Sequence, residues 1–371
     1  MSRNYQICTR CIMDTTDPDI EFDENGVCNH CREYDKLARR YVFAGTKGEQ
    51  KLSKVVDKIK KQGKNQKYDC VIGLSGGVDS TYTAYLTRKL GLKPLAIHLD
   101  NGWDTEFSVG NIENIVKRLK LDLYTHVVDW EEFRDIHLAY LKSGVVDIEV
   151  PTDHAIVAIL YKIADENRIK YILIGNNFTT EGIFPESWAY NKNDLINLKA
   201  IHDKFGTREL KTFPTLGLLK LIYYHFVKNI RSISILNYVP YVKENVKKVL
   251  AEELDWRDYG HKHYESVFTR FYQGYILPRR FNIDKRRSHL SALICSGQIK
   301  RDDALKVMEN EPYTGYDLAS EKAYVLKKLQ LTDEEFNELM NLPIKSHLEY
   351  KSDAQWFRPV RFAYRILNWK R

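Results

Sequence analysis

The chain has 371 residues, of which 43% are hydrophobic, and it carries a formal net charge of +7. This length is enough to bury a full core and predicts two or three domains. The N-terminus has no apolar signal region, and the longest apolar stretch, residues 216–227, is too short and too interrupted to cross a bilayer. We therefore expect a cytoplasmic protein without a stable membrane span.

The first predicted element is a small metal-binding segment at residues 1–45. Two Cys-x-x-Cys pairs supply four thiolates, the set that tetrahedral Zn²⁺ prefers: Cys8, Cys11, Cys28 and Cys31. His30 lies inside the second pair and could replace a cysteine, although four cysteines are sufficient. Two disulfides are the alternative, which a reducing cytoplasm disfavours. We predict a zinc ribbon with a structural Zn²⁺, because a four-cysteine site leaves no coordination position open.

A lysine-rich stretch follows at residues 46–67. It contains Val55, Val56 and Ile59, which form one apolar stripe at helical spacing. We predict a basic connecting helix with solvated lysines, and a contact with nucleic acid is the alternative. The modest positive charge of the whole chain fits a phosphate-rich substrate as well as a nucleic acid.

The most informative motif, Ser75-Gly76-Gly77-Val78-Asp79-Ser80, lies between a predicted strand at residues 71–74 and a predicted helix at residues 80–90. Glycines let a backbone approach phosphate closely, hydroxyl and amide groups donate hydrogen bonds, and the helix N-terminus adds partial positive charge. Asp79 beside a polyanion indicates a metal ion between them. The motif therefore predicts a nucleotide with Mg²⁺, held by all six residues. An ordinary tight turn is the alternative.

Strand and helix signals alternate after this loop. Further strands are predicted at residues 94–100, 123–128 and 171–175, and helices at 109–119, 131–142 and 153–167, the last capped by Thr152 or Asp153. Such alternation predicts an α/β fold with a parallel, doubly wound sheet, here over residues 68–230. His98 alternates with apolar neighbours inside a strand, which favours a core histidine over a catalytic one.

Ligands of such sheets bind at the carboxyl ends of the strands. Two further segments should therefore meet the phosphate loop there, one at residues 100–103 and one at residues 175–182. The additional candidates for nucleotide binding are Asp100, Asn101, Gly102, Gly175 and Asn176.

The loop is not a Walker A sequence, because no Gly-Lys-Ser/Thr follows at the required spacing. It resembles the pyrophosphate loop of the ATP-pyrophosphatase superfamily, which implies an adenine nucleotide alpha hydrolase-like (PP-loop) domain. Members split ATP between the α and β phosphates, transfer AMP to a carbonyl oxygen, and let nitrogen or sulfur displace it. The resemblance places residues 100–103 against adenosine and makes Glu181 a second Mg²⁺ ligand beside Asp79. Asp79, Ser80 and Glu181 are thus the catalytic candidates.

The last predicted region, residues 231–371, is aromatic and mainly helical, and we expect it to contact substrate or a partner. Five cations lie between residues 279 and 287. Arginine forks fit carboxylate and phosphate groups, so a pocket for an anionic substrate is one interpretation and a solvated face or an RNA patch is the other.

The whole chain resembles the bacterial N-acetyl sugar amidotransferases of surface-polysaccharide, O-antigen and nonulosonic-acid pathways. The resemblance is carried by the four cysteines, the loop at 75–80, Gly175-Asn176-Asn177, and the blocks at 256–260, 262–266, 268–275, 278–280 and 284–287. It implies conversion of a sugar acetamido group to acetamidino, with a glutaminase and a barrel-type subunit delivering ammonia. The implied substrate is an acetamido sugar or nucleotide sugar, with these contact candidates: His263, Glu265, Arg270, Arg279, Arg280, Arg286 and Arg287.

Two other functions stay open. One is a tRNA-thiolating enzyme of the same fold, although the cysteines outside the ribbon are only Cys70, expected inside a strand, and Cys295. The other is a non-catalytic nucleotide-binding scaffold. The chain shows no glutaminase motif, since Ser2 follows Met1 where an N-terminal cysteine nucleophile would stand. Nucleic acid is not expected as a partner in the preferred interpretation.

Overall fold

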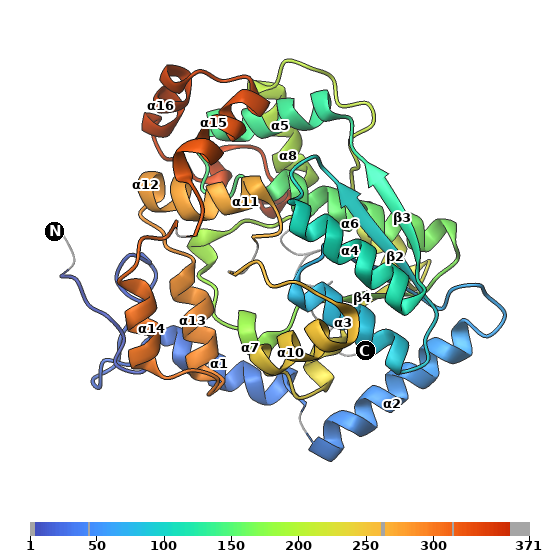
Figure 1. Cartoon of the computed structure of the whole chain (residues 1–371). Coiled ribbons are helices and arrows are strands. Elements are labelled where there is room, and N and C mark those ends of the chain that lie inside the picture. The colour runs from blue at the N-terminus through green and yellow to red at the C-terminus, as the bar shows by residue number, and fades with distance from the viewer. Residues whose placement is uncertain (1–3, 44, 261–263, 314, 357–371) are drawn as a thin grey trace.

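The computed structural model describes residues 4–43, 45–260, 264–313 and 315–356 (Figure 1). Its strands are β1 Cys70–Gly73, β2 Pro94–Asp100, β3 Asp122–Val127, β4 Tyr171–Ile174 and β5 Arg231–Ser234. The helices of the first two thirds are α1 Asn29–Tyr41, α2 Gly45–Gln62, α3 Val78–Lys89, α4 Glu106–Leu119, α5 Trp130–Ser143, α6 Val150–Glu166, α7 Phe178–Glu181, α8 Leu195–Phe205, α9 Leu218–Phe226 and α10 Lys243–Leu254. Those of the last third are α11 Val267–Phe271, α12 Leu277–Phe281, α13 Arg286–Cys295, α14 Arg301–Met308, α15 Leu318–Leu329, α16 Asp333–Asn341 and α17 Asp353–Trp356.

Short helical turns connect these elements. In the part of the chain that the structure describes, 3₁₀ turns lie at Glu186–Trp188, Ile235–Tyr238 and His347–Glu349. A π-helical turn, Tyr272–Ile276, joins α11 to α12 in one continuous helical run. Within the described ranges, each helix is too short or too polar to cross a lipid bilayer.

The sheet is parallel throughout, in the order β3-β2-β1-β4-β5. This confirms the predicted parallel α/β fold, whose chain direction around the sheet reverses between β1 and β4. The sequence missed β5, a short edge strand in which only Ile233 is strongly apolar. β5 begins one residue after the expected domain end at 230, so the sheet extends past that boundary.

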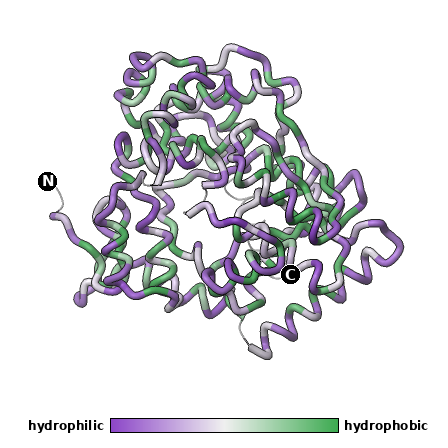
Figure 2. The backbone as a smooth tube through the Cα atoms, viewed as in Figure 1, coloured by the Kyte–Doolittle hydropathy of each residue, from purple (hydrophilic) through white to green (hydrophobic). Residues whose placement is uncertain are grey.

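Helices cover both faces of the sheet. On one face, Ile72 and Ala96 pack with apolar residues of α2, α3, α4 and α10. On the other face, Val71 and Leu95 pack with α6 and α9. Neighbouring strand residues thus enter opposite cores, as the alternation of side chains along a strand requires. Figure 2 shows the hydrophobic segments running through the centre of this layered region.

A third core lies outside the sheet and joins distant parts of the chain. It contains Phe133 of α5, Leu198 of α8, Phe268 and Phe271 of α11, and Phe336 of α16, together with the four N-terminal cysteines. In Figure 1 these helices form a separate layer above the sheet. The C-terminal region is therefore packed against α5 and α8 and shares a core with residues that the sequence assigned to the nucleotide domain.

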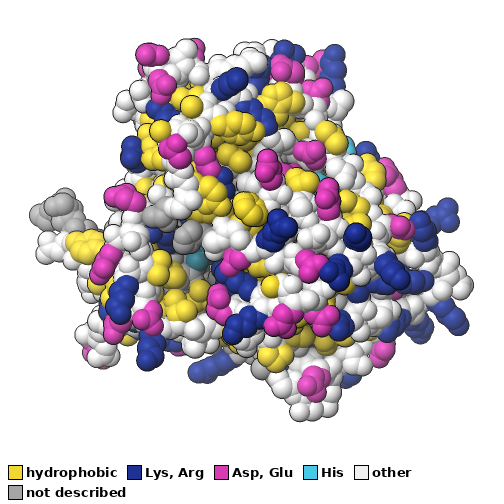
Figure 3. Space-filling view, in the orientation of Figure 1, with side chains coloured by type: hydrophobic (Ala, Val, Ile, Leu, Met, Phe, Trp, Pro, Cys, Tyr) yellow, Lys and Arg dark blue, Asp and Glu magenta, His cyan; other side chains and the backbone are white. Residues whose placement is uncertain are grey.

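Helices α6 and α2 differ in how well they match the helices predicted from the sequence. α6 begins at Val150 with Glu149 as its N-cap residue, so the predicted cap at Thr152 or Asp153 is wrong. Pro151 explains the earlier start, because proline is favoured in the first helical turn, where its missing N–H is not needed. The basic connecting helix is present as α2, which buries Leu52, Val56 and Ile59. In Figure 3, Lys and Arg side chains on the viewed face are interspersed with Asp and Glu.

Candidate functional site

The phosphate loop turns from β1 into α3 and is held by its own hydroxyl groups. Ser80 Oγ accepts a hydrogen bond from Ser75 N at 3.3 Å and donates one to Gly77 O at 3.1 Å. Ser75 Oγ accepts from Gly77 N at 3.3 Å. These contacts close the loop into a compact turn at the N-terminus of a helix, the geometry that binds phosphate groups in proteins.

Two glycines are required by the close packing around this turn. Gly76 has φ +77°, and a Cβ there would lie 2.6 Å from Ser108 O. Its carbonyl oxygen accepts a hydrogen bond from Trp256 Nε1 at 2.9 Å. Gly175 follows β4, and a Cβ there would lie 3.0 Å from Ser80 N. The loop and the β4 segment therefore meet at the carboxyl ends of β1 and β4, as predicted.

The two predicted carboxylate ligands of Mg²⁺ lie on either side of Asn177. Asn177 Nδ2 donates to Asp79 Oδ1 at 3.4 Å, and Asn177 N donates to Glu181 Oε2 at 3.4 Å. Tyr241 donates its hydroxyl hydrogen to Asp79. Burial, followed by the charges of Asp79 and Glu181, raises the pKa of Tyr241 and keeps this hydroxyl protonated as a donor. The pair offers the oxygen ligands that Mg²⁺ requires.

A cavity of about 770 Å³ opens at this end of the sheet. It is lined by these residues that the sequence had proposed: Ser75, Gly77, Val78, Asp79, Ser80, Asn101, Gly175, Asn176, Glu181 and Glu265. Gly76, Asp100 and Gly102 adjoin it without lining it. His98 does line it, and its ring nitrogens contact Leu74 O at 2.9 Å and Asp104 Oδ2 at 3.1 Å. His98, which the sequence predicted to be a core histidine, is thus buried and also forms part of the cavity wall.

The predicted substrate arginines lie away from this cavity. Arg270 is buried, forms an ion pair with Glu321 and stacks on the Tyr316 ring at 3.7 Å. Arg280 donates to Leu141 O at 3.2 Å, and Arg279 stacks on the Tyr275 ring at 4.3 Å.

The remaining predicted substrate contacts are Arg286, Arg287 and His263. Arg286 pairs with Asp284 at 2.7 Å and donates to the carbonyl oxygen of Asn310. Arg287 Nη1 donates to Ile12 O at 3.0 Å in the N-terminal segment. His263 falls outside the described residues. The basic run therefore ties structural elements together, and Glu265 alone of the described contact candidates reaches the cavity.

Sequence reasoning missed a buried charged group in the same cavity. Asp147 and Glu149 are 1% and 8% exposed, and Lys192 Nζ lies 2.6 Å from Asp147 Oδ2. Thr269 Oγ1 donates to Glu149 Oε2 at 2.8 Å, and Lys285 also lines the wall. The available signal was the apolar run at residues 145–150, in which two carboxylates are embedded.

The four paired cysteines come together as predicted. Their sulfur atoms all lie within 4.8 Å of one another, with Cys8 and Cys31 at 3.9 Å and Cys11 and Cys28 at 3.7 Å. Tetrahedral Zn–S bonds of about 2.3 Å imply sulfur separations of about 3.8 Å, so the cluster fits zinc. The sulfurs are too far apart for disulfides. Contacts with the thiols of Cys11 and Cys8 raise the pKa of Cys28, while the contact with Cys31 opposes the rise.

Two residues near the cluster differ from their predicted surroundings. His30 Nε2 contacts Asp17 Oδ2 at 2.6 Å, which directs its ring away from a ligand role. Cys295, which stood alone in the sequence, has its sulfur 3.7 Å from that of Cys31. Cys70 is buried in β1, as expected.

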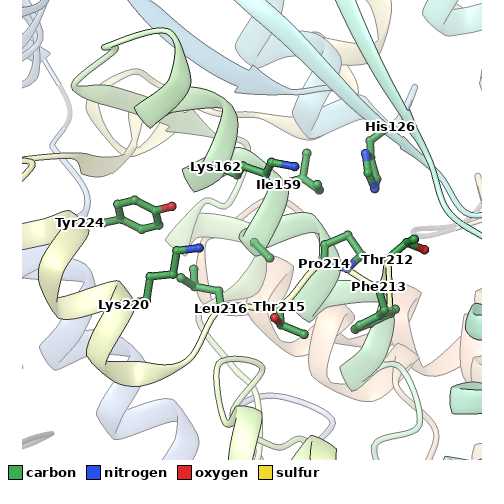
Figure 4. A pocket seen from close by; sticks show the side chains of 11 residues that line it. His126, Ile159, Lys162, Thr212, Phe213, Pro214, Thr215, Leu216, Lys220 and Tyr224 are labelled. Atoms are coloured by element: carbon green, nitrogen blue, oxygen red, sulfur yellow. The ribbon is translucent and has the colours of Figure 1, made fainter. Parts of the chain in front are cut away.

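A second, smaller cavity of about 240 Å³ lies between α6, α9 and residues 212–216. Figure 4 shows Lys162 and Lys220, which come from different helices, with His126 across from them. None of the predicted site residues lines it.

Comparisons with known proteins match two parts of the chain to families. Residues 49–183 match the family described as NAD synthase. Residues 265–363 match the family described as LPS biosynthesis protein WbpG-like, C-terminal domain. The first match contains the phosphate loop and the segment at 175–182, and the second contains Glu265, Thr269 and Lys285.

A curated relative and solved structures were also found. The tRNA-specific 2-thiouridylase MnmA 2 of Fusobacterium nucleatum is 31% identical over 119 residues, which are 30% of this chain and 34% of that protein. The chain thus spans about a third of the relative's length.

Among solved structures, the NH₃-dependent NAD synthetase from Campylobacter jejuni is 18% identical, covering 43% of this chain and 76% of that chain, with a TM-score of 0.29. The NMN synthetase from Francisella tularensis is 15% identical, covering 62% and 93%, with a TM-score of 0.29. These scores are too low to assign a role to any residue.

Proposed function

We propose that this chain, which combines an NAD synthase-type phosphate-loop domain with a WbpG-like C-terminal domain, is an ATP-dependent amidotransferase acting on an acetamido sugar. One observation carries the proposal. The cavity at the phosphate loop is also lined by Thr269, Gln273 and Lys285 of the WbpG-like region. A nucleotide at the loop and an acceptor held by the C-terminal domain would therefore share one cavity, as a transfer between them requires.

The proposed reaction has two steps. The acetamido oxygen attacks the α-phosphorus of ATP, the bond to the β-phosphate oxygen breaks, and pyrophosphate leaves. Ammonia then adds to the imidate carbon, the carbon–oxygen bond breaks, AMP leaves, and the nitrogen gives up a proton to form the acetamidino group. A neutral amide is a poor electrophile, and adenylation converts its oxygen into a leaving group.

The residues of the loop would act by position and charge. Backbone N–H groups from Ser75 to Ser80 and the N-terminus of α3 would hold the departing pyrophosphate. Asp79 and Glu181 would hold Mg²⁺, which when bound neutralises phosphate charge. Tyr241 and Asn177 keep the Asp79 carboxylate in one orientation through the hydrogen bonds described above.

The ammonia would come from other subunits. The resemblance to the sugar amidotransferases implies a separate glutaminase subunit and a barrel-type subunit. Free ammonium at high concentration should replace both in a purified system.

The test is direct. The full chain is incubated with ATP, Mg²⁺, ammonium and a set of N-acetylated sugars and nucleotide sugars. We expect AMP and pyrophosphate together with a product in which one oxygen is replaced by NH, detected by mass spectrometry. Release of ADP and phosphate instead, or of AMP without the amidino product, would contradict the proposal.

Thiolation of tRNA is the second candidate, favoured by the match to the 2-thiouridylase. Cys70 is buried inside β1, and the Cys295 sulfur lies beside that of Cys31. Neither thiol therefore lines the cavity at the phosphate loop, where a sulfur-transferring cysteine would be needed. If tRNA is the substrate, its binding should weaken steeply between low and moderate salt, with a slope set by the phosphates contacted.

A further inference from the structure

The smaller of the two cavities has basic side chains in its wall. It measures about 240 Å³ and lies between β3, α6, α9 and the segment that precedes α9. His126, Lys162 and Lys220 line it, whereas none of the eleven described residues around it is an acid. The larger cavity differs, because carboxylates such as Asp79 and Glu149 form part of its wall. The smaller cavity therefore suits an anion rather than a cation.

The protein itself neutralises the two lysines only weakly. Lys162 Nζ lies 4.0 Å from Glu166 Oε1, and both side chains are about half exposed. Water screens such an exposed pair, so Glu166 cancels little of the lysine charge. Lys220 forms no ion pair at 4.0 Å or less within the described ranges, and its Nζ lies 5.6 Å from the centre of the Tyr224 ring. Both ammonium groups can therefore hold an anionic ligand.

His126 extends the positive character of the cavity to β3. Its ring lies across from the two lysines (Figure 4) and forms no hydrogen bond with another described residue. Burial, followed by the charge of Lys162, lowers the pKa of His126. The field of Lys162 thus reaches the imidazole ring, and an anion bound in the cavity would offset it. Thr212 and Thr215 supply hydroxyl groups, which can donate hydrogen bonds to the same ligand.

Buried polar side chains fix the irregular part of the wall. Residues 206–216 contain no helix or strand. Glu132 Oε2, on α5, accepts a hydrogen bond from Thr212 N at 2.9 Å. His154 Nε2, on α6, accepts one from Leu216 N at 3.0 Å. Glu132 and His154 are both buried, and burial of such groups is tolerated only when hydrogen bonds satisfy them. This segment is therefore held in one conformation, so the cavity is formed before a ligand binds.

The size and the floor of the cavity limit the ligand. Its volume is below the roughly 300–1,000 Å³ of cavities that take drug-sized molecules. Ile159, Phe213, Pro214 and Leu216 supply apolar surface beneath the basic groups. Apolar surroundings strengthen the attraction between a lysine and an anion. The ligand should therefore be small, with one strongly anionic group and a short carbon body.

We propose that this cavity is a second ligand site, which binds the phosphate group of a small molecule through Lys162 and Lys220 and receives its carbon body on the apolar floor. Ammonium groups are common ligands of phosphate, and a dianion matches two lysines in charge. The site is separate from the phosphate loop, and the inference holds whether or not the proposed reaction is correct. Ile159 lines both cavities, so the bound molecule would contact a side chain of the wall between them.

The test measures binding while the phosphate loop is occupied. The full chain, saturated with Mg²⁺ and a non-hydrolysable ATP analogue, is titrated in a calorimeter with glycerol 3-phosphate, inorganic phosphate and glycerol. We expect glycerol 3-phosphate to bind most tightly, inorganic phosphate more weakly, and glycerol not at all at millimolar concentration. Lys162→Met and Lys220→Met should each weaken the binding of glycerol 3-phosphate about tenfold. The affinity for the ATP analogue should change by less than about twofold.

Exposed lysines elsewhere provide the matched controls, Lys306→Met and Lys248→Met. Lys306 Nζ lies 4.0 Å from Asp303 Oδ1, the same separation as in the Lys162–Glu166 pair, and it lines neither cavity. Because Lys162 and Lys220 are also exposed, their variants should fold, and equal melting temperatures of variants and controls would verify this.

Three outcomes would overturn the inference. They are no binding of either phosphate compound at millimolar concentration, affinities in the lysine variants equal to those in the controls, and an equal loss of affinity for the ATP analogue. Inorganic phosphate that binds as tightly as glycerol 3-phosphate, with the same dependence on the two lysines, would support the site and identify the free ion as its ligand.

Discussion

Arg287 Nε lies 3.1 Å from Asp14 Oδ2, so the basic run of the C-terminal region is joined to the cysteine segment by an ion pair. Asp14 is fully buried. Arg301 strengthens the same contact, because its guanidinium donates to the carbonyl oxygens of Cys8 and Cys11 at 2.9 and 3.0 Å. The cysteine segment is therefore fixed to α13 and α14 through arginines rather than standing apart as a separate module.

Replacing Arg287 should consequently affect stability and not substrate binding. Arg287→Met leaves the buried Asp14 carboxylate without its cation, which we expect to cost about 2–4 kcal/mol of unfolding free energy. Arg279→Met is the control from the same run, since Arg279 is exposed and its contact among the described residues is stacking on Tyr275. Urea unfolding measures the first effect. A raised acceptor KM with unchanged stability in Arg287→Met would instead restore the arginine pocket predicted from the sequence.

The cysteine cluster gives a second prediction. Cys8→Ser should lose zinc and lower the melting temperature, because it removes one of the four sulfurs that lie within 4.8 Å of one another. Cys295→Ser should retain zinc, since the Cys295 sulfur approaches that of Cys31 but is not part of the group of four found among the described residues. Elemental analysis of the purified variants gives the zinc content per chain. Loss of zinc from Cys295→Ser would show a different ligand set.

Gly175 tests how closely the β4 segment must approach the phosphate loop. In Gly175→Ala the new Cβ would lie 3.0 Å from the Asp79 carbonyl carbon and from Ser80 N, which are backbone atoms that cannot move aside alone. We expect KM for ATP to rise about tenfold and stability to fall by about 1–3 kcal/mol. Gly110→Ala in α4 is the control, because nothing lies within 4 Å of its Cβ and alanine favours a helix by about 0.5–1 kcal/mol. Equal ATP kinetics in both variants would contradict this geometry.

Asp79 carries the most demanding prediction on activity. Asp79→Asn keeps the shape of the side chain and removes its charge, so Mg²⁺ would lose a charged oxygen ligand while the loop stays folded. Pyrophosphate release should fall by about 10³-fold or more. Tyr241→Phe removes only the hydrogen bond that orients Asp79, and we expect a smaller loss with unchanged melting temperature. Full activity of Asp79→Asn would contradict the assigned role.

The sequence predicted those parts of the site that depend on local order. The loop at 75–80, the strands before it and after it, and the cysteine pairs all follow from short motifs and from hydrophobic alternation. The arginines could not be placed in this way. Arg287 forms its ion pair with Asp14, which lies near the other end of the sequence, and no local pattern encodes that contact. β5 was missed because a half-exposed edge strand needs few apolar residues.

The carboxylate pair was missed for a related reason. In sequence, Asp147 and Glu149 resemble ordinary loop acids, and only the packing of α11 and residues 190–192 against them makes their burial evident. Acids that alternate with Val145, Ile148 and Val150 are nevertheless a usable signal, because an exposed loop has no need of such apolar neighbours.

Burial of Glu149 should make stability depend on pH. Burial first, and then the charge of Asp153, raises the pKa of Glu149 to about 7, while Thr269, Lys192 and Lys285 oppose the rise. Between its usual value of 4.5 and 7 the folded state therefore holds a proton that the unfolded state has lost, so this group makes stability fall as pH rises, by about 3 kcal/mol in all. Glu149→Gln cannot ionise and should lack this component. Urea unfolding at pH 5 and pH 8 compares the two proteins, with Glu338→Gln as the exposed control. The quantity compared is the change in unfolding free energy between pH 5 and pH 8. If this change is the same in Glu149→Gln and in the unaltered protein, Glu149 does not titrate in this range.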